Sequence, residues 1–391
     1  MAISADELFL RQALELAARG EALASPNPMV GALVVDERGR ILGSGTHCYA
    51  ELKHAEVLAL EEAGEQARGN TLYLNLEPCS HVGRTGPCAE AVIKAGIARV
   101  VCCMEDPNPR VAGRGFAMLR DAGIEVEVGL LENEAKKLNE SFAQYIRTGL
   151  PFVTLKAAMT LDGKIAGSNA QSGSSASYIT GEVARAEVHR MRHAADAIMV
   201  GVGTVVADNP MLTDRSGLPR RRRLLRVILD STLRLPLNSR VVETAQDDVI
   251  VFCSFAEENK RRELEARGVR VEQVSIEDGE GLRSPMPHGG RPDLYRVLSL
   301  LGAEGITSLL VEGGAVVNWA CLRSRLVDKL ALFFTPRIFG PADTVPWLEG
   351  ELGLPQGVSI EASNLSLERY GDDFAAICYL RDPYQPLGPQ G

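Results

Sequence analysis

"HAEV" at His54–Val57 and "LEPCSHVGRTGPC" at Leu76–Cys88 are the two stretches that decide how the chain folds around a metal. A histidine, a glutamate two positions later and two cysteines that each follow a proline lie close together in the sequence. Zinc prefers imidazole nitrogen and thiolate sulfur, and a catalytic zinc site uses three protein ligands with its fourth position open. His54, Cys79 and Cys88 supply three such ligands, so the pattern predicts a zinc (Zn2+) site.

Glu56 distinguishes a catalytic site from a structural one. Residues two apart on a helix do not face each other, so Glu56 converges with His54 only if the metal lies against the first helical turn. A carboxylate in that place can carry protons while zinc-activated water attacks a ring carbon, which is the chemistry of hydrolytic deamination. Zinc deaminases have H-x-E and a cysteine pair, although the C-x8-C spacing here is wider than C-x-x-C.

A closed structural zinc site is the alternative. Such a site needs a fourth protein ligand, and the sequence offers His81 inside the cysteine loop and His47 or Cys48 upstream. In that case the protein would be a scaffold held together by zinc, and Glu56→Gln would have no effect.

Length and composition limit the possible functions. The chain has 391 residues, which favours two or three domains, and its 45% hydrophobic and 24% charged residues are typical of a globular protein. A net charge of -9 disfavours binding to nucleic acid. The basic run "PRRRRLLR" at Pro219–Arg226 is predicted to be a solvated loop.

No stretch approaches the length of a membrane span, and the N-terminus does not resemble a signal peptide. We therefore expect a cytoplasmic protein without a membrane partner. In a reducing compartment its eight cysteines are thiols or metal ligands rather than disulfides. Cys102, Cys103, Cys253 and Cys378 lie in apolar, strand-like runs and are predicted core residues.

The first part of the chain alternates between helical and strand-like patterns, which is typical of α/β domains. "SADE" predicts a helix start in which Ser4 and Glu7 cap each other's backbone amides. The order helix, strand, strand, helix, strand, helix, strand, helix predicts one helix-covered sheet over residues 1–147. The predicted strands are 29–36, 40–47, 70–76 and 98–104, and the later helices begin at His54, after Cys88 and near Gly115.

A second α/β domain is predicted over residues 150–381, followed by an irregular tail at 382–391 that is rich in proline and glycine. Strand-like runs occur at 151–159, 195–202, 224–230, 247–254, 269–274, 306–314 and 328–336, and helical patterns at 181–194, 256–267, 292–301 and 315–322. The domain lacks G-x-G-x-x-G, so a Rossmann site is not indicated. In "VGVGTVVADNP" and "LLVEGGAVVN" a strand runs into glycines and then a helix, and the two together could hold a dinucleotide.

"SPNPMVGALVV", "HAEV", "EPCSHVGRTGPC" and "DPNPRVAGRG" together resemble the bifunctional deaminase/reductase family of riboflavin biosynthesis. The resemblance implies an N-terminal domain of cytidine-deaminase fold and a C-terminal domain similar to dihydrofolate reductase. It implies deamination of 2,5-diamino-6-(5-phosphoribosylamino)pyrimidin-4-one, a small phosphorylated pyrimidine, and then reduction of its ribosyl group to ribityl with NADPH. By this resemblance His54, Cys79 and Cys88 would bind zinc, Glu56 would be catalytic, and Asn27 would be either part of the pocket wall or a turn residue.

The same resemblance assigns residues of the second domain. Its opening strand would carry Lys156 and Asp162 in the matching places. The residues expected along NADPH are Met159, Tyr178, Thr204, Asp208, Ser231, Gly313, Gly314, Ala315, Val316 and Val317. Those expected to hold substrate are Lys156, Ala176, Arg192, Leu212, Arg215 and Glu312. The arginines suit a phosphate, which a guanidinium can bind with two parallel hydrogen bonds, although Arg192 could equally be an exposed helix residue.

The sequence departs from the family pattern in three places, none of which removes a metal ligand or Glu56. Tyr178 stands where the family has tryptophan, and "SGSSASY" leaves Ser175 or Ser177 as the substrate serine, with Ala176 at the ungapped position. Glu51 and Gly86 replace a frequent glycine and proline. Tyr178 and the ambiguous serine leave a deaminase with an impaired reductase domain as one alternative. A zinc base deaminase acting on another nucleotide or on nucleic acid, which could share the zinc motif, is the other. We also expect a homo-oligomer.

Overall fold

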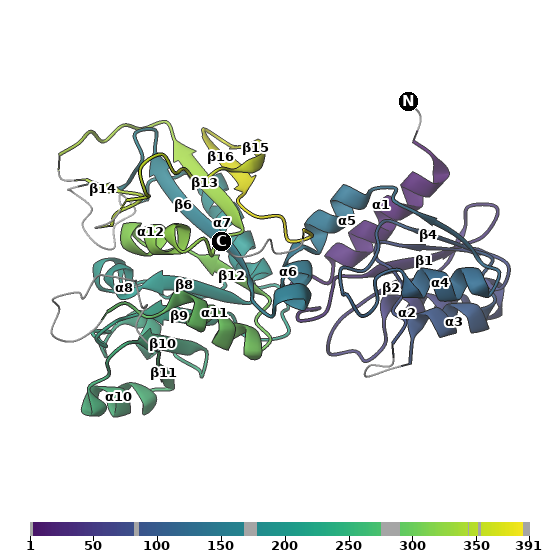
Figure 1. Ribbon diagram of the computed structural model, residues 1–391, viewed down its shortest axis with the longest axis horizontal. Helices are drawn as coiled ribbons and strands as arrows, with labels where there is room; N and C mark the ends of the chain where they lie inside the picture. The colour runs from purple at the N-terminus through teal and green to yellow at the C-terminus, as the bar shows by residue number, and fades with distance from the viewer. Residues whose placement is uncertain are drawn as a thin grey trace. The chain divides into compact units, whose positions relative to one another are not determined.

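The computed structural model describes residues 3–81, 86–167, 178–274, 290–342, 344–350 and 353–385. The chain forms two compact units (Figure 1). Unit 1 consists mainly of Met1–Gly149, and unit 2 of Leu150–Leu218 and Arg222–Pro383. Pro219–Arg221 and Tyr384 belong to unit 1.

Unit 1 contains a five-stranded sheet with the strand order β2-β1-β3-β4-β5. β1 pairs antiparallel with both β2 and β3, whereas β3, β4 and β5 run parallel. The strands are β1 (Gly31–Val35), β2 (Ile41–Thr46), β3 (Thr71–Leu74), β4 (Arg99–Cys102) and β5 (Glu125–Val128). β1 is buried along its whole length, which places it at the centre of the core.

Helices cover both faces of this sheet. Thr46 donates from its Oγ1 to the Leu16 carbonyl of α1 (3.0 Å), while the next residue inward, Gly45, faces α2. Because successive residues of a strand point to opposite faces, α1 and α2 lie on opposite sides. The row α2, α3, α4 can be followed in Figure 1. The helices are α1 (Ala5–Ala18), α2 (Ala55–Ala63), η1 (Gly64–Ala67), α3 (Cys88–Ala95), α4 (Arg114–Asp121), α5 (Glu132–Leu138) and α6 (Glu140–Thr148).

Two glycines of β2 let α2 lie directly on the sheet. A Cβ on Gly45 would lie 2.1 Å from the Ala55 carbonyl oxygen, and one on Gly43 would lie 2.2 Å from that of Ala59. Any larger residue would push the helix away. The start of α2, with His54 as its N-cap, is therefore fixed against β2.

Unit 2 contains a nine-stranded sheet with the order β11-β10-β9-β8-β12-β6-β13-β16-β15. The seven strands from β11 to β13 are parallel, and β16 and β15 continue the sheet antiparallel. Its strands are β6 (Phe152–Thr160), β8 (Ala197–Gly201), β9 (Leu225–Leu229), β10 (Val249–Cys253), β11 (Val269–Gln273), β12 (Ser308–Val311), β13 (Lys329–Thr335), β15 (Ser363–Tyr370) and β16 (Asp373–Tyr379). A separate pair joins β7 (Lys164–Ala166) and β14 (Val345–Pro346).

Alternating residues of these strands pack on opposite faces of the sheet. Met199 of β8 packs with α11 and α12, whereas its neighbours Ile198 and Val200 pack with α8, α9 and α10. The parallel strands are therefore buried on both faces, as parallel sheets usually are. The helices are α7 (Glu182–Ala194), α8 (Val202–Asp208), α9 (Arg240–Glu243), α10 (Glu258–Glu265), α11 (Leu294–Ala303) and α12 (Ala315–Arg323).

The predicted α/β class and the predicted order of elements in unit 1 are confirmed. The sequence patterns did not anticipate β5, α5 and α6, or α9, β15 and the small strands β7 and β14 of unit 2. No helix among the described residues is long and apolar enough to cross a membrane. Of the predicted tail at 382–391, residues 386–391 lie outside the described residues.

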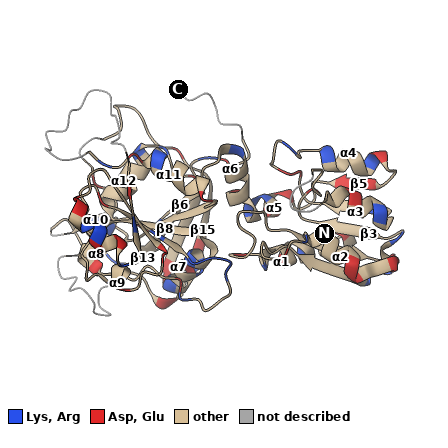
Figure 2. Cartoon of the chain, turned by 90° about the horizontal axis from the view of Figure 1, so that it is seen from below, with Lys and Arg blue, Asp and Glu red and all other residues tan. Residues whose placement is uncertain are grey.

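The prediction that Pro219–Arg226 is a solvated loop is wrong in its second half. Arg222 binds the Asp196 carboxylate (2.9 Å) and the Gly305 carbonyl (2.6 Å). Arg226 is 1% exposed and binds Asp248 (2.6 Å). Figure 2 shows basic and acidic residues interleaved on α10. Internal ion pairs, rather than a surface patch, account for these two arginines.

Candidate functional site

The three predicted metal ligands of unit 1 meet at one point. The ligand atoms of His54, Cys79 and Cys88 all lie within 4.8 Å of one another. The His54 Nδ1 is 3.1 Å from the Cys88 Sγ and 3.6 Å from the Cys79 Sγ. This set of one imidazole and two thiols is one that zinc accepts, so the residues fit the metal that the sequence predicted.

Two of the ligands lie at helix starts and the third lies in a loop. His54 is the N-cap of α2, and Cys88 is the first residue of α3. Cys79 lies in the loop that follows β3, where its carbonyl accepts from the Ala89 amide (3.2 Å) and its Sγ accepts from the Cys88 amide (3.3 Å). The two helix starts and this loop bring the ligands together.

The two thiols differ in acidity. A hydrogen bond from the Cys88 thiol, opposed by burial and assisted by His54, lowers the pKa of Cys79 to about 4. The same hydrogen bond, together with burial, raises the pKa of Cys88. One thiolate is thus already favoured at Cys79, and thiolate is the form that binds a metal.

Glu56 lies in the first turn of α2 and is 3% exposed. Burial, followed by the negative charge of Cys79, raises its pKa to about 7. Its carboxylate also interacts with His54 and Cys88, so it faces the metal group. Glu56 can therefore converge with His54, because His54 is the N-cap of α2 and the metal-binding group lies against the first turn of that helix. A carboxyl group with a pKa near 7 can both accept and release a proton at neutral pH.

Within the described parts of the chain, the metal-binding group contains no fourth side chain. His47 and Cys48 are outside it, as is the exposed His81. The His47 ring is instead held by other partners: its Nε2 lies 2.9 Å from the Asn27 Nδ2, and its Nδ1 lies 3.3 Å from the Lys53 carbonyl. The described residues therefore leave the group with three ligands.

Asn27 forms a turn, and its side chain points towards the side of His54. Its amide N–H closes a turn by donating to the Ala24 carbonyl (3.0 Å). Its side chain reaches His47, whose ring centroid lies 5.1 Å from that of His54. Asn27 therefore lies near the metal group, separated from His54 by the ring of His47.

Two buried asparagines that sequence reasoning did not identify fix the segment after Asn27. Asn139 accepts from the Met29 amide (2.8 Å) and donates to the Met29 carbonyl (3.0 Å). Asn75 donates to the same carbonyl (2.9 Å) and accepts from the Gly31 amide (2.9 Å). Asn75 and Asn139 are 0% and 2% exposed. No spacing rule marks them, because their partners are remote in sequence.

Two buried carboxyl groups in the quoted motifs were also not identified. Glu77 is 3% exposed and accepts backbone hydrogen bonds from the segment 106–116. Asp106 is 7% exposed, and burial raises its pKa to about 7, with Glu77, Cys79 and Glu56 adding to the rise. The segment containing Asp106 is therefore electrostatically coupled to the metal group.

In unit 2 the predicted cofactor residues other than Tyr178 lie at one edge of the sheet. Met159 is near the end of β6, Thr204 and Asp208 lie on α8 directly after β8, and Ser231 follows β9. Gly313–Val317 follow β12. These four strands are parallel neighbours in the order β9-β8-β12-β6, so their carboxyl ends share one edge. Ligands of open α/β sheets bind at this edge.

The two glycine turns of the predicted cofactor site pack against each other. Gly201 and Gly314 are the N-caps of α8 and α12. Cβ atoms on Gly201 and Gly313 would meet the Val317 side chain at 2.8 and 2.7 Å, and one on Gly314 would lie 3.3 Å from the Thr204 Oγ1. Packing between the turns explains these glycines, whereas Gly203 faces open space. This geometry brings the two turns together, which is the arrangement that the predicted dinucleotide site needs.

Three predicted substrate residues form a buried charge cluster. Glu312 binds Arg192 through both oxygens (2.5 and 3.0 Å), and the Lys156 Nζ lies 3.6 Å from the Glu312 Oε2. Burial alone would raise the pKa of Glu312, but the charges of Lys156 and Arg192 hold that pKa below its usual value. The Arg192 side chain is 14% exposed, so it is not a solvent-facing helix residue.

The remaining predicted substrate and cofactor residues are not part of this charge cluster. Leu212 has a positive φ of 56° and is buried. Arg215 is exposed, and its charge and that of Arg192 both act on His189. Tyr178 is 55% exposed and lies under the Arg185 guanidinium (4.7 Å). Ala176, Ser175 and Ser177 lie outside the described residues.

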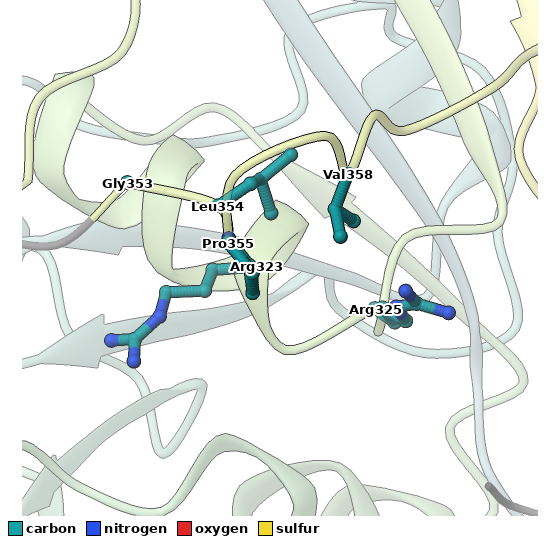
Figure 3. A pocket seen from close by; sticks show the side chains of 6 residues that line it. All are labelled: Arg323, Arg325, Gly353, Leu354, Pro355 and Val358. Carbon is teal, nitrogen blue, oxygen red and sulfur yellow. The ribbon is translucent and has the colours of Figure 1, made fainter.

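A hollow of about 450 Å³ lies elsewhere on unit 2. Arg323, at the end of α12, Arg325 and Val358 are among its lining residues, and Figure 3 shows the two arginine side chains extending to opposite sides. It contains none of the residues that the sequence assigned to substrate or cofactor.

Two family models match the chain. Residues 3–104 match the cytidine and deoxycytidylate deaminase zinc-binding region, which includes all three ligands and Glu56. Residues 151–375 match the RibD C-terminal domain. The first match falls within unit 1, and the second falls within unit 2 except for Pro219–Arg221.

Relatives match over nearly the whole chain. The riboflavin biosynthesis protein RibD of Bacillus amyloliquefaciens is 42% identical over 348 residues, 88% of each chain. That of Escherichia coli (strain K12) is 40% identical over 358 residues, 90% of this chain and 94% of the relative.

Solved structures match as well. RibD of Acinetobacter baumannii, form 1, has a TM-score of 0.80 at 34% identity and covers 97% of this chain and 99% of its own. A diaminohydroxyphosphoribosylaminopyrimidine deaminase/5-amino-6-(5-phosphoribosylamino)uracil reductase of Thermotoga maritima has a TM-score of 0.76 at 35% identity, over 96% and 98%. With its zinc-binding deaminase region in unit 1 and its RibD C-terminal domain in unit 2, the chain belongs to the RibD family, the bifunctional deaminase/reductases of riboflavin biosynthesis.

Proposed function

We propose that unit 1 deaminates 2,5-diamino-6-(5-phosphoribosylamino)pyrimidin-4-one at a zinc site formed by His54, Cys79 and Cys88, and that unit 2 then reduces the ribosyl group to ribityl with NADPH. The observation that carries the proposal is the buried Glu56 carboxyl group facing a three-ligand metal group. A purely structural zinc site has no use for such an acid. The similarity to the Thermotoga maritima protein, which is named as a deaminase and reductase of phosphoribosylated pyrimidines, supports the choice of substrate.

In unit 1 the roles follow from chemistry and placement. Bound zinc would supply an activated water as the nucleophile. Glu56 accepts one proton from the attacking water and passes it to the ring nitrogen, then accepts the second proton of the same oxygen and passes it to the departing amine, because its raised pKa suits both transfers. Asn27 and His47 line the wall next to His54 and orient the pyrimidine.

In unit 2 the proposed cofactor site is the edge where β9, β8, β12 and β6 end. NADPH would supply the hydride. Glu312 is kept ionised by Lys156 and Arg192, so it can accept hydrogen bonds from ribose hydroxyl groups. Arg192 is already paired with both oxygens of Glu312. The exposed Arg215 is therefore the better partner for the substrate phosphate.

A coupled assay on the purified full chain tests the proposal. Ammonia release and loss of NADPH absorbance are followed together after addition of the diaminopyrimidine substrate. The proposal predicts that both occur and that ammonia appears first. Absence of ammonia release from a zinc-loaded chain would overturn it, and ammonia release without NADPH loss would instead establish the deaminase with an impaired reductase domain. The homo-oligomer and the cytoplasmic location stay predictions.

A further inference from the structure

We propose that Glu77 is a positioning residue for the zinc ligand Cys79, which it ties to the start of α4 through its carboxylate. The inference rests on the proposed zinc site. No other carboxylate of the described residues shows this set of contacts: Glu77 accepts four backbone hydrogen bonds while standing two positions before a metal ligand.

The four hydrogen bonds divide evenly between the two oxygens. Oε1 accepts from the amides of Gly115 (2.8 Å) and Phe116 (3.3 Å). Oε2 accepts from those of Gly113 (2.9 Å) and Asp106 (3.0 Å). Gly113 is the N-cap of α4, so a remote carboxylate satisfies amides that the helix itself leaves without partners. Its negative charge also suits the positive end of the helix.

The backbone next to Glu77 is in close contact with the same helix. A Cβ on Gly115 would lie 2.0 Å from the Pro78 carbonyl oxygen and 3.0 Å from the Glu77 Oε1. The Glu77 amide donates to the Met104 carbonyl (3.1 Å). Pro78 has a fixed φ, so few rotations separate these anchored atoms from Cys79. On its other side, the Cys79 carbonyl accepts from Ala89 of α3 (3.2 Å).

Glu77 therefore connects the metal ligand with the segment 106–116, which also carries the buried Asp106. Supporting groups behind metal ligands typically change metal affinity by about 10-fold to 100-fold when they are removed. Glutamine cannot replace Glu77, because its single oxygen serves at most two of the four amides and its N–H2 group would face the other two donors.

The first test compares Glu77→Gln with Glu90→Gln in the full chain. Glu90 is an exposed glutamate of α3, two positions after a ligand, and serves as the matched control. Glu77→Gln is expected to bind zinc about 10-fold to 100-fold more weakly and to shift the visible absorption bands of the Co²⁺-substituted chain. Ammonia release with saturating zinc should lose kcat, while reductase turnover on deaminated substrate stays within about twofold of the parent chain.

A second variant and a measurement on the parent chain cover the case in which Glu77→Gln does not fold. Gly115→Ala, which pushes on Pro78 from α4, is expected to shift the Co²⁺ bands in the same way. In the unmodified chain, zinc loading is expected to slow hydrogen exchange at the amides of Gly113, Gly115 and Phe116, because coupling between two sites is reciprocal.

Unchanged Co²⁺ bands and unchanged zinc affinity in Glu77→Gln would overturn the inference, and so would exchange at these three amides that does not respond to zinc. Either result would leave the zinc site itself intact. A parent chain that takes up neither Zn²⁺ nor Co²⁺ would overturn the proposed function and this inference with it.

Discussion

Glu56 is the residue that we propose carries protons in deamination. Replacing it with glutamine keeps the size of the side chain and removes the group that exchanges a proton. We expect Glu56→Gln to retain zinc and to lose ammonia release by about 10²-fold to 10⁴-fold, the usual contribution of a general acid–base group. Ammonia release and zinc content measured on the same sample check this. Reductase turnover on deaminated substrate is the internal control, and near-parental ammonia release would contradict the assigned role.

Asp106 gives a pH dependence with a defined sign. Its folded-state pKa of about 7 lies above the usual aspartate value, so the folded chain binds this proton more tightly than the unfolded chain. The free energy of unfolding of unit 1 should therefore fall as the pH rises from about 4 to about 7, by at most about 1.4 kcal/mol per pH unit from this group.

Asp106→Asn should remove that part of the slope. This slope is measured by urea unfolding at several pH values and fixed zinc content, with hydrogen exchange in peptides of unit 1 as the readout. Parallel pH profiles for the parent and the variant would show that Asp106 does not titrate as proposed.

At this scale the sequence predicted the ligands and Glu56, because metal chemistry restricts the residue types and the spacing. It did not predict Asn75, Asn139, Glu77 or Asp106. Their partners are backbone groups of remote segments, and no local pattern encodes such contacts. It also left open whether Arg192 is exposed, which depends on Glu312 far along the chain.

Among the elements, α2 is placed by the glycines of β2. A Cβ on Gly45 would come within 2.1 Å of the Ala55 carbonyl, between His54 and Glu56. We expect Gly45→Ala to lower the free energy of unfolding of unit 1 by about 1–3 kcal/mol, the usual cost of overpacking, and to weaken zinc binding. Gly86→Ala, where a Cβ meets nothing within 4 Å, is the control. Equal stability and zinc affinity in the two variants would contradict this account of α2.

Element boundaries show where sequence patterns reach their limit. Ser4 caps α1 as predicted by accepting from the Glu7 amide (3.1 Å), but Glu7 does not return the bond and pairs with Arg11 (2.6 Å) instead. The strand β5 was not predicted because its residues are largely exposed, so it lacks an apolar signal. The boundary between β8 and α8 was predicted imprecisely, because no polar residue intervenes between them: the predicted strand ran to residue 202, which is the first residue of α8.

For the whole molecule, two units imply two activities that respond separately to the metal. Removing zinc with a chelator should abolish ammonia release and leave reductase turnover on deaminated substrate unchanged, because the metal group lies in unit 1 and the charge cluster of Glu312 in unit 2. Adding zinc back should restore ammonia release. Parallel loss of both activities would contradict the separation.

The alternation of helices and strands was enough to predict two α/β units, since each pattern has its own period. The order of the nine strands of unit 2 was not predictable in the same way. Pairings such as β6 with β13 and β12 join segments that are far apart in the sequence, and only the folded sheet shows that the glycine turns after β8 and β12 are neighbours.

X-ray absorption at the zinc edge of the loaded full chain is the most direct measurement of the central proposal, a metal held by three side chains with one position left for chemistry. We predict two sulfur ligands near 2.3 Å and one imidazole nitrogen near 2.0–2.1 Å, with no further protein side chain. A second imidazole or a third sulfur in the spectrum would show a closed structural site and contradict the proposal.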